Sequence, residues 1–228
     1  MRLKPYSKCL TTPYGVLQNF SKSAVLIFFL ICQPAFAEQP TVLVLGDSLT
    51  QGYGLAQHDG FVPQLRQWLS DQGTPAHIIN AGVSGDTTAG GLERVEWSLA
   101  EGVDAMIVAL GSNDMLRGIA PDDSYRNIEN ILKIGQRGGV RLMIIGVRAS
   151  GNFGPIYKKN FDAIFPKLAK IYQAEYVDHF FEGLMDPSQP SQPALKYLQR
   201  DRMHPNRKGV QKVVKTIGTT VQQLIAEH

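Results

Sequence analysis

The chain has 228 residues, of which 43% are hydrophobic and 19% charged, with a formal net charge of +3 at pH 7. This length and composition suit one globular domain with its own core. The positive charge belongs to the N-terminal segment, because without residues 1–37 Lys+Arg falls from 23 to 19 against 20 Asp+Glu. The remaining chain has no basic run with interleaved aromatic residues, which argues against nucleic acid as a partner. Both cysteines, Cys9 and Cys32, lie in the same segment, so the rest of the chain has no disulfide to stabilise it.

Residues 1–37 have the layout of a secretory signal peptide. The segment carries four basic residues and no acidic one, residues 24–32 (AVLIFFLIC) are uninterrupted apolar, and residues 35–37 (AFA) offer small side chains for cleavage. The apolar run is shorter than the roughly 20 residues that span a bilayer, although an uncleaved N-terminal anchor stays open as an alternative. We therefore expect a periplasmic or secreted protein with one mature domain, residues 38–228, that does not insert stably into the membrane.

Short apolar runs alternate with segments of helical periodicity along this domain. The first, third and fourth runs are apolar on both faces, as parallel strands covered by helices on both sides require. The alternation predicts a three-layer α/β/α sandwich with a five-stranded parallel sheet. The strands are expected at residues 41–45 (TVLVL), 77–80 (HIIN), 105–110 (AMIVAL), 142–147 (LMIIGV) and 174–177 (AEYV), with later helices at 124–137, 156–172 and 205–226.

Two further expectations concern packing and loops. Trp68 and Trp97 fall in the first two predicted helices, and we expect both to be anchors in the core. Residues 178–203 lack periodicity and contain three prolines, which predicts a long loop with a short helix near residues 194–198. A loop of this length in a compact domain is usually functional.

Polar, glycine-containing turns follow the first three predicted strands. They are residues 46–49 (GDSL), 81–86 (AGVSGD) and 111–114 (GSND). Ligands of parallel sheets bind at the carboxyl ends of the strands, so all three turns would open onto one rim. Taken singly, each turn has the residues that turns use anyway.

Asp201 and His204, which come just before the last helix, favour a catalytic interpretation. A serine hydroxyl becomes a good nucleophile only when a base takes its proton and a partner orients that base. The three-residue spacing could place the Asp201 carboxylate against the His204 imidazole, and Pro205 restricts the backbone of His204 to extended conformations. Ser48 would then be the nucleophile.

Three groups on the same rim could stabilise the oxyanion of an acyl-transfer reaction. They are the backbone N–H of Ser48, the backbone N–H of Gly82 and the side-chain amide of Asn113. No histidine, cysteine or acidic cluster has metal-ligand spacing, and no dinucleotide or phosphate-binding motif follows a strand. The sequence therefore predicts a hydrolase without a metal or cofactor.

Four blocks in this order resemble the SGNH hydrolase superfamily, known by its Gly-Asp-Ser-Leu signature. They are residues 46–49 (GDSL), 80–87 (NAGVSGDT), 111–114 (GSND) and 201–206 (DRMHPN), and the likeness extends from residue 41 to the C-terminus. Within the superfamily, residues 49–54 (LTQGYG) are similar to those of the bacterial thioesterase I, lysophospholipase L1 and arylesterase group. Arg202 and Met203 depart from that pattern, which usually has Gly-Ile between the Asp and the His.

The resemblance implies Ser48 as nucleophile, His204 as base, Asp201 as its orienting partner, and Ser48, Gly82 and Asn113 as oxyanion-hole donors. It also implies a flavodoxin-like strand order 2-1-3-4-5 and a periplasmic enzyme that cleaves acyl esters and thioesters through an acyl-serine intermediate. The expected partner is a small-molecule acyl ester or thioester, lipid-derived substrates included, and the expected state is a monomer.

Two alternatives remain open on the residues alone. The same machinery could serve carbohydrate O-deacetylation. From a different class, the chain could be a non-catalytic α/β binding module in which Ser48, Asn113 and His204 only complete turns.

Overall fold

The computed structural model describes residues 39–99, 101–186 and 189–226, so the predicted signal peptide lies outside the described residues. Five strands form one parallel sheet in the order β2-β1-β3-β4-β5, which confirms the predicted fold class and strand order. No helix in these ranges is long and apolar enough to cross a membrane. The strands are β1 (Thr41–Gly46), β2 (His77–Gly82), β3 (Ala105–Ala109), β4 (Arg141–Ile145) and β5 (Glu175–Val177).

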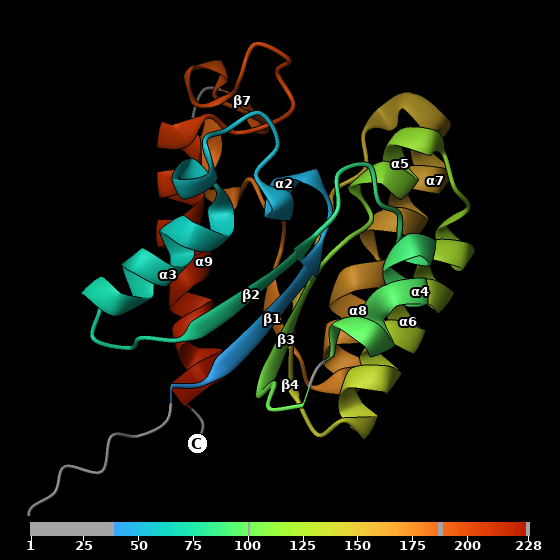
Figure 1. The fold of residues 1–228 in the computed structure, drawn as a ribbon. Coiled ribbons are helices and arrows are strands. Elements are labelled where there is room, and N and C mark those ends of the chain that lie inside the picture. Colours follow the sequence, from blue (N-terminus) through green and yellow to red (C-terminus); the bar gives the residue numbers. More distant parts are fainter. Residues whose placement is uncertain (1–38, 100, 187–188, 227–228) are drawn as a thin grey trace, which may run out of the picture. The chain divides into compact units, whose positions relative to one another are not determined.

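Helices cover both faces of the sheet, and successive side chains of the central strands serve the two layers in turn (Figure 1). On β1, Val42 and Val44 belong to one buried cluster, and Leu43 and Leu45 belong to the other. Helices α3 (Phe61–Asp71) and α9 (Arg207–Ala226) pack on the first face. The second face is covered by α4 (Thr88–Ser98), α6 (Pro121–Arg137), α7 (Gly154–Asp162) and α8 (Ile164–Tyr172).

Two short helices begin at the carboxyl end of the sheet. Helix α2 (Ser48–Gln51) follows β1, and α5 (Ser112–Arg117) follows β3. All the strands are parallel, but β2 is added on one side of β1 and β3 on the other, so the strand order changes direction at β1. Such a switch point is where open α/β sheets bind their ligands, and both short helices flank it.

The region between β5 and α9 contains short elements that the sequence analysis left as a loop. They are a two-stranded antiparallel hairpin, β6 (Met185–Asp186) with β7 (Gln189–Pro193), and three-residue helices at Glu182–Leu184 and Leu195–Tyr197. The second of these confirms the short helix expected near residues 194–198. Further three-residue helices lie at Gln57–Asp59 and Gly151–Phe153.

Several local predictions were wrong. Trp97 is 88% exposed rather than a core anchor, because the buried residues of α4 are Thr88, Gly91 and Val95 and Trp97 lies off that face. Trp68 does pack against the core, next to Gly218 of α9. The single helix expected over residues 156–172 is two helices that meet at Ala163.

Candidate active site

Ser48 is the first residue of α2, immediately after the central strand β1. Asp47 caps this helix, and its Oδ1 accepts a hydrogen bond from the Leu49 N–H at 3.0 Å. Gly46 has to be glycine, because a Cβ there would lie 2.0 Å from the Thr50 hydroxyl oxygen. The turn therefore holds the Ser48 side chain at the switch point of the sheet.

A chain of hydrogen bonds joins Ser48, His204 and Asp201. Ser48 Oγ lies 2.8 Å from His204 Nε2, and His204 Nδ1 lies 2.7 Å from Asp201 Oδ2. Because a carboxylate only accepts, the proton of the neutral imidazole belongs on Nδ1, and Nε2 is free to accept the Ser48 proton. The structure thus brings together the three side chains that the sequence analysis named, although Ser48 and His204 are 156 positions apart in the chain.

Asp201 is kept ionised by its own turn. Its Oδ1 accepts the backbone N–H of Met203 at 2.9 Å and that of His204 at 3.1 Å. These bonds, the one from Met203 first, and the bond to the imidazole lower the pKa of Asp201 to about 2. A carboxylate that stays charged at working pH can orient the imidazole and stabilise its cationic form.

The segment that carries His204 is anchored on both sides. The His204 carbonyl accepts the Gln199 N–H at 2.8 Å, and the Gln199 side chain donates to the carbonyls of Tyr53 and Pro205 at 2.8 and 3.0 Å. The Tyr53 ring lies 4.8 Å from the imidazole, between ring centroids. Asn206 donates to two further carbonyls of the same segment. The imidazole of His204 is therefore held in position by its own segment and by Tyr53.

Asn113 lies on α5, and the neighbouring Asp114 fixes this helix in place. Asp114 is fully buried, accepts the Thr88 N–H at 2.9 Å and accepts the Ser124 hydroxyl at 3.0 Å. The carboxylate thus ties α5 to the first turns of α4 and α6. Such a rigid attachment suits a side chain that must present its amide to one point.

Gly82, which the sequence analysis names as an oxyanion donor, has its N–H engaged elsewhere. The N–H donates to the side-chain oxygen of Asn80 at 3.0 Å. The following N–H, of Val83, points to the Gly46 carbonyl of β1, so the Gly82 N–H faces away from β1. Its predicted role therefore requires Asn80 to release this group first.

Gly85, three residues further on, offers a donor that the sequence analysis missed. The Asp86 N–H closes a turn onto the Val83 carbonyl at 3.1 Å, and Gly85 has φ +81°. This is the third position of a type II turn, whose N–H has no partner within the turn. Arg117 of α5 holds the Gly85 carbonyl at 2.8 Å, which links this turn to the helix of Asn113. The glycine between Ser84 and Asp86 is the signal that could have found it.

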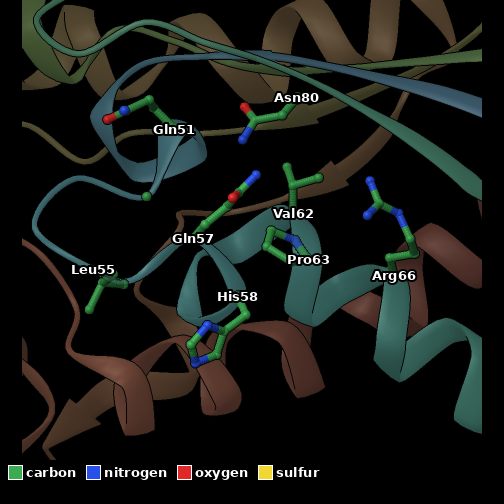
Figure 2. Close-up of a pocket in the computed structure, with 9 residues that line it drawn as sticks. Gln51, Leu55, Gln57, His58, Val62, Pro63, Arg66 and Asn80 are labelled. Atoms are coloured by element: carbon green, nitrogen blue, oxygen red, sulfur yellow. The ribbon is translucent and has the colours of Figure 1, made fainter.

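A hollow of about 530 Å³ lies beside α2, but it does not contain the predicted catalytic residues. Figure 2 shows Asn80, Gln57 and Arg66 among the side chains that line it, together with Val62 and Pro63 of α3. Gln51 and Asn80 link it to the neighbouring turn, since Gln51 accepts the Ser84 hydroxyl and Asn80 accepts the Gly82 N–H. No group of three or more potential metal-ligating side chains occurs in the part of the chain that the structure describes.

Asp47 is a buried acid directly before Ser48 in the chain. Its side chain is fully inaccessible, and burial raises its pKa from 3.8 to about 6. The Asp47 carboxyl therefore binds its proton more tightly in the folded protein than in the unfolded chain. Its contribution to stability is fully present below about pH 4, where the group is protonated in both states, and is lost as the pH rises through 6. The difference between the two pKa values corresponds to about 3 kcal/mol of unfolding free energy.

Asp47→Asn is therefore expected to change how stability depends on pH. Asparagine keeps the oxygen that accepts the Leu49 N–H but cannot ionise, so relative to wild type the variant should gain about 3 kcal/mol of unfolding free energy between pH 4 and pH 7. Urea denaturation at several pH values measures this. Asp71→Asn, an exposed position on α3, is the control and should follow wild type. Parallel curves for wild type and Asp47→Asn would contradict the assignment.

Comparisons with known proteins identify the family of this chain. The model of the GDSL-like Lipase/Acylhydrolase family matches residues 44–212. The chain is 31% identical over 204 residues to Esterase TesA of Pseudomonas aeruginosa, which covers 89% of this chain and 97% of that protein. It is 31% identical to Thioesterase 1/protease 1/lysophospholipase L1 of Escherichia coli K12, over 79% of this chain and 83% of that protein.

A solved structure gives the same relationship. The crystal structure of AlinE4, an SGNH-hydrolase family esterase, matches with a TM-score of 0.67 and 37% identity, covering 83% of this chain and 98% of that one. The family match and these identities span most of the described domain. The chain belongs to the GDSL-like lipase/acylhydrolase family and is an acyl ester hydrolase of the SGNH type.

Proposed function

We propose that this acyl ester hydrolase works through an acyl-enzyme intermediate on Ser48, with His204 as general base and Asp201 as its orienting partner. The observation that carries the proposal is the unbroken hydrogen-bond chain, 2.8 Å from Ser48 to His204 and 2.7 Å from His204 to Asp201. Such a chain supplies both requirements of a serine nucleophile, a base within reach and a fixed tautomer of that base.

The reaction follows from this arrangement in two halves. His204 Nε2 takes the hydroxyl proton while Ser48 Oγ bonds to the acyl carbon, and the carbonyl oxygen becomes an oxyanion. When the intermediate collapses, the bond to the leaving oxygen or sulfur breaks and the imidazolium returns the proton to that atom. A water molecule, deprotonated by the same nitrogen, then attacks the acyl-serine, and Ser48 leaves with its proton as the carboxylic acid is released.

The oxyanion needs preorganised donors. We assign the backbone N–H of Ser48 and the amide of Asn113 to this role, as the sequence analysis predicts. Gly85 contributes the third donor, because its N–H is free of the turn and its carbonyl is tied to the helix of Asn113. Gly82 would join only if Asn80 released its N–H.

The surroundings of Ser48 favour an acyl chain as the group that is bound. Large apolar side chains are exposed on the segments that carry the site: Leu116 on α5, Val83 after β2, and Tyr53 and Met203 beside the imidazole. Each of them is about half exposed, so a hydrocarbon chain could cover them and remove apolar surface from water. We therefore propose carboxylic acyl esters and thioesters, lipid-derived ones included, as the substrate class.

Substrate profiling tests this class. With p-nitrophenyl esters of increasing acyl length, acyl thioesters and acetylated sugars, we expect kcat/KM to favour the acyl esters and thioesters. Leu116→Ser should lower kcat/KM for long acyl chains about fivefold while leaving acetyl esters nearly unchanged, since it removes apolar contact worth roughly 1 kcal/mol. Ile171→Ser is the matched control, an exposed apolar residue on α8. A strong preference for acetylated sugars would instead support the carbohydrate O-acetylesterase alternative.

We also propose that residues 1–37 are removed as a secretory signal and that the mature enzyme is a periplasmic or secreted monomer. The basic lead, the short apolar run and the small residues before Glu38 support this proposal. N-terminal sequencing of the protein recovered from the periplasm or medium would test it, and retention of residues 1–37 in a membrane fraction would support the anchor instead.

A further inference from the structure

Arg94 of α4 joins three segments that meet at the active site. Its Nε lies 2.8 Å from Asp86 Oδ2, its Nη1 donates to the Ala81 carbonyl at 2.8 Å, and its Nη2 donates to the Gly46 carbonyl at 3.0 Å. Gly46 ends β1 two residues before Ser48, and Ala81 lies at the end of β2. Asp86 closes the turn that contains Gly85. One guanidinium therefore connects the nucleophile strand, the neighbouring strand and the glycine turn.

The surroundings of this contact make it stronger and more directional than a surface ion pair. The Arg94 and Asp86 side chains are only 20% and 12% exposed. A planar guanidinium presents several N–H groups in fixed directions, whereas a lysine ammonium is a single point of charge on a flexible stem and cannot match three separated acceptors. The same carboxylate also accepts the Thr87 N–H through its other oxygen, at 3.1 Å. Asp86 is thereby held between Arg94 and the start of α4.

The sequence of α4 accommodates this contact at the expense of helix propensity. A Cβ at Gly90 would lie 1.9 Å from Asp86 Oδ1, so only glycine lets the helix approach this carboxylate. Glycine is among the weakest helix formers in a helix interior. Glycine at position 90 is therefore required by the position of the Asp86 carboxylate and not by helix propensity.

We propose that Arg94 is a positioning residue for acyl transfer: it sets the distance between Ser48 and the donor turn at Gly85. It touches neither substrate nor His204, and it acts through the main chain of Gly46 and through Asp86. This inference rests on the proposed function, because it concerns where the oxyanion donor lies relative to the nucleophile. A misplacement of about 1 Å in such a site can lower the rate about 10²-fold.

Kinetics of Arg94→Met, Arg94→Lys and Asp86→Asn test the role. We expect Arg94→Met to lower kcat about 10²-fold with KM within about threefold of wild type, because the donor acts on the transition state. The kcat of Arg94→Lys should exceed that of Arg94→Met by less than about tenfold, since charge alone does not restore three contacts.

Arg66→Met is the matched control. Arg66 also donates to a carbonyl of β2, that of Ile78 at 2.8 Å, and none of the hydrogen bonds found among the described residues joins it to the glycine turn. It should keep wild-type kcat. Thermal unfolding gives the folded fraction of each protein. If Arg94→Met does not fold, the kcat values of Arg94→Lys and Asp86→Asn test the positioning role instead.

Two results would overturn the inference while leaving the proposed function intact. One is wild-type kcat in the Arg94 variants, and the other is a loss of rate that matches the loss of folded protein, which would make Arg94 merely structural. A failure of the proposed function looks different, because the wild-type protein itself would then neither hydrolyse esters nor react with a phosphonate.

Discussion

Ser48→Ala is expected to lower kcat for ester hydrolysis by about 10⁵-fold or more, with the fold unchanged. In the proposed mechanism the Ser48 hydroxyl forms the acyl-enzyme bond, and losses of this order follow when the nucleophile of a serine hydrolase triad is deleted. The rate that remains comes from the oxyanion donors and from substrate binding alone. Steady-state kinetics on a short p-nitrophenyl ester measures the effect.

Ser70→Ala provides the control for that measurement, because Ser70 is an exposed serine on α3 and should be kinetically silent. The two variants should unfold at temperatures close to that of wild type. If Ser48→Ala keeps even a hundredth of wild-type kcat, Ser48 does not carry the acyl group, and the non-catalytic reading of the GDSL turn gains support.

Asp201→Asn should lower kcat by about 10⁴-fold with little change in KM. An amide in place of the carboxylate can donate to His204 Nδ1, which moves the imidazole proton to Nε2 and leaves that nitrogen unable to accept the Ser48 proton. The wild-type carboxylate stays ionised at working pH and so cannot donate to Nδ1, because its pKa is lowered to about 2. Between pH 5 and pH 8, titration of Asp201 therefore contributes nothing to the wild-type rate profile.

An exposed acid elsewhere on the surface, Asp122 on α6, supplies the comparison for Asp201→Asn. Asp122→Asn should retain wild-type kcat across the pH range. Equal activity of Asp201→Asn and wild type would show that His204 is oriented without the carboxylate, and the hydrogen bonds at 2.7, 2.9 and 3.1 Å would then have only a structural meaning.

The sheet could be predicted because buried parallel strands have a simple signature. β1, β3 and β4 are apolar on both faces, and their bounds differ from the predicted runs by only one or two residues. The hydrogen-bonded arrangement of Ser48, His204 and Asp201 could be predicted for a related reason. Ser48 follows a buried strand directly, and Asp201 and His204 are close in sequence, so local spacing already indicates their geometry.

Other features depend on contacts that spacing cannot reveal. Trp97 is a large apolar residue, but the orientation of α4 on the sheet leaves its side chain exposed to solvent. A glycine marks a candidate donor, but the fold decides which main-chain N–H is engaged: Asn80 accepts the N–H of Gly82, whereas that of Gly85 has no partner within its turn. The contacts of Arg94 reach 8, 13 and 48 residues along the chain, and only the folded structure brings them together.

Intact-mass spectrometry after incubation with a fluorophosphonate tests the central claim most directly. For this chain we predict one adduct on wild type, none on Ser48→Ala, and a peptide map that places the added mass on Ser48. Folded wild-type protein without an adduct, or an adduct that persists in Ser48→Ala, would contradict the account of Ser48 as the activated nucleophile.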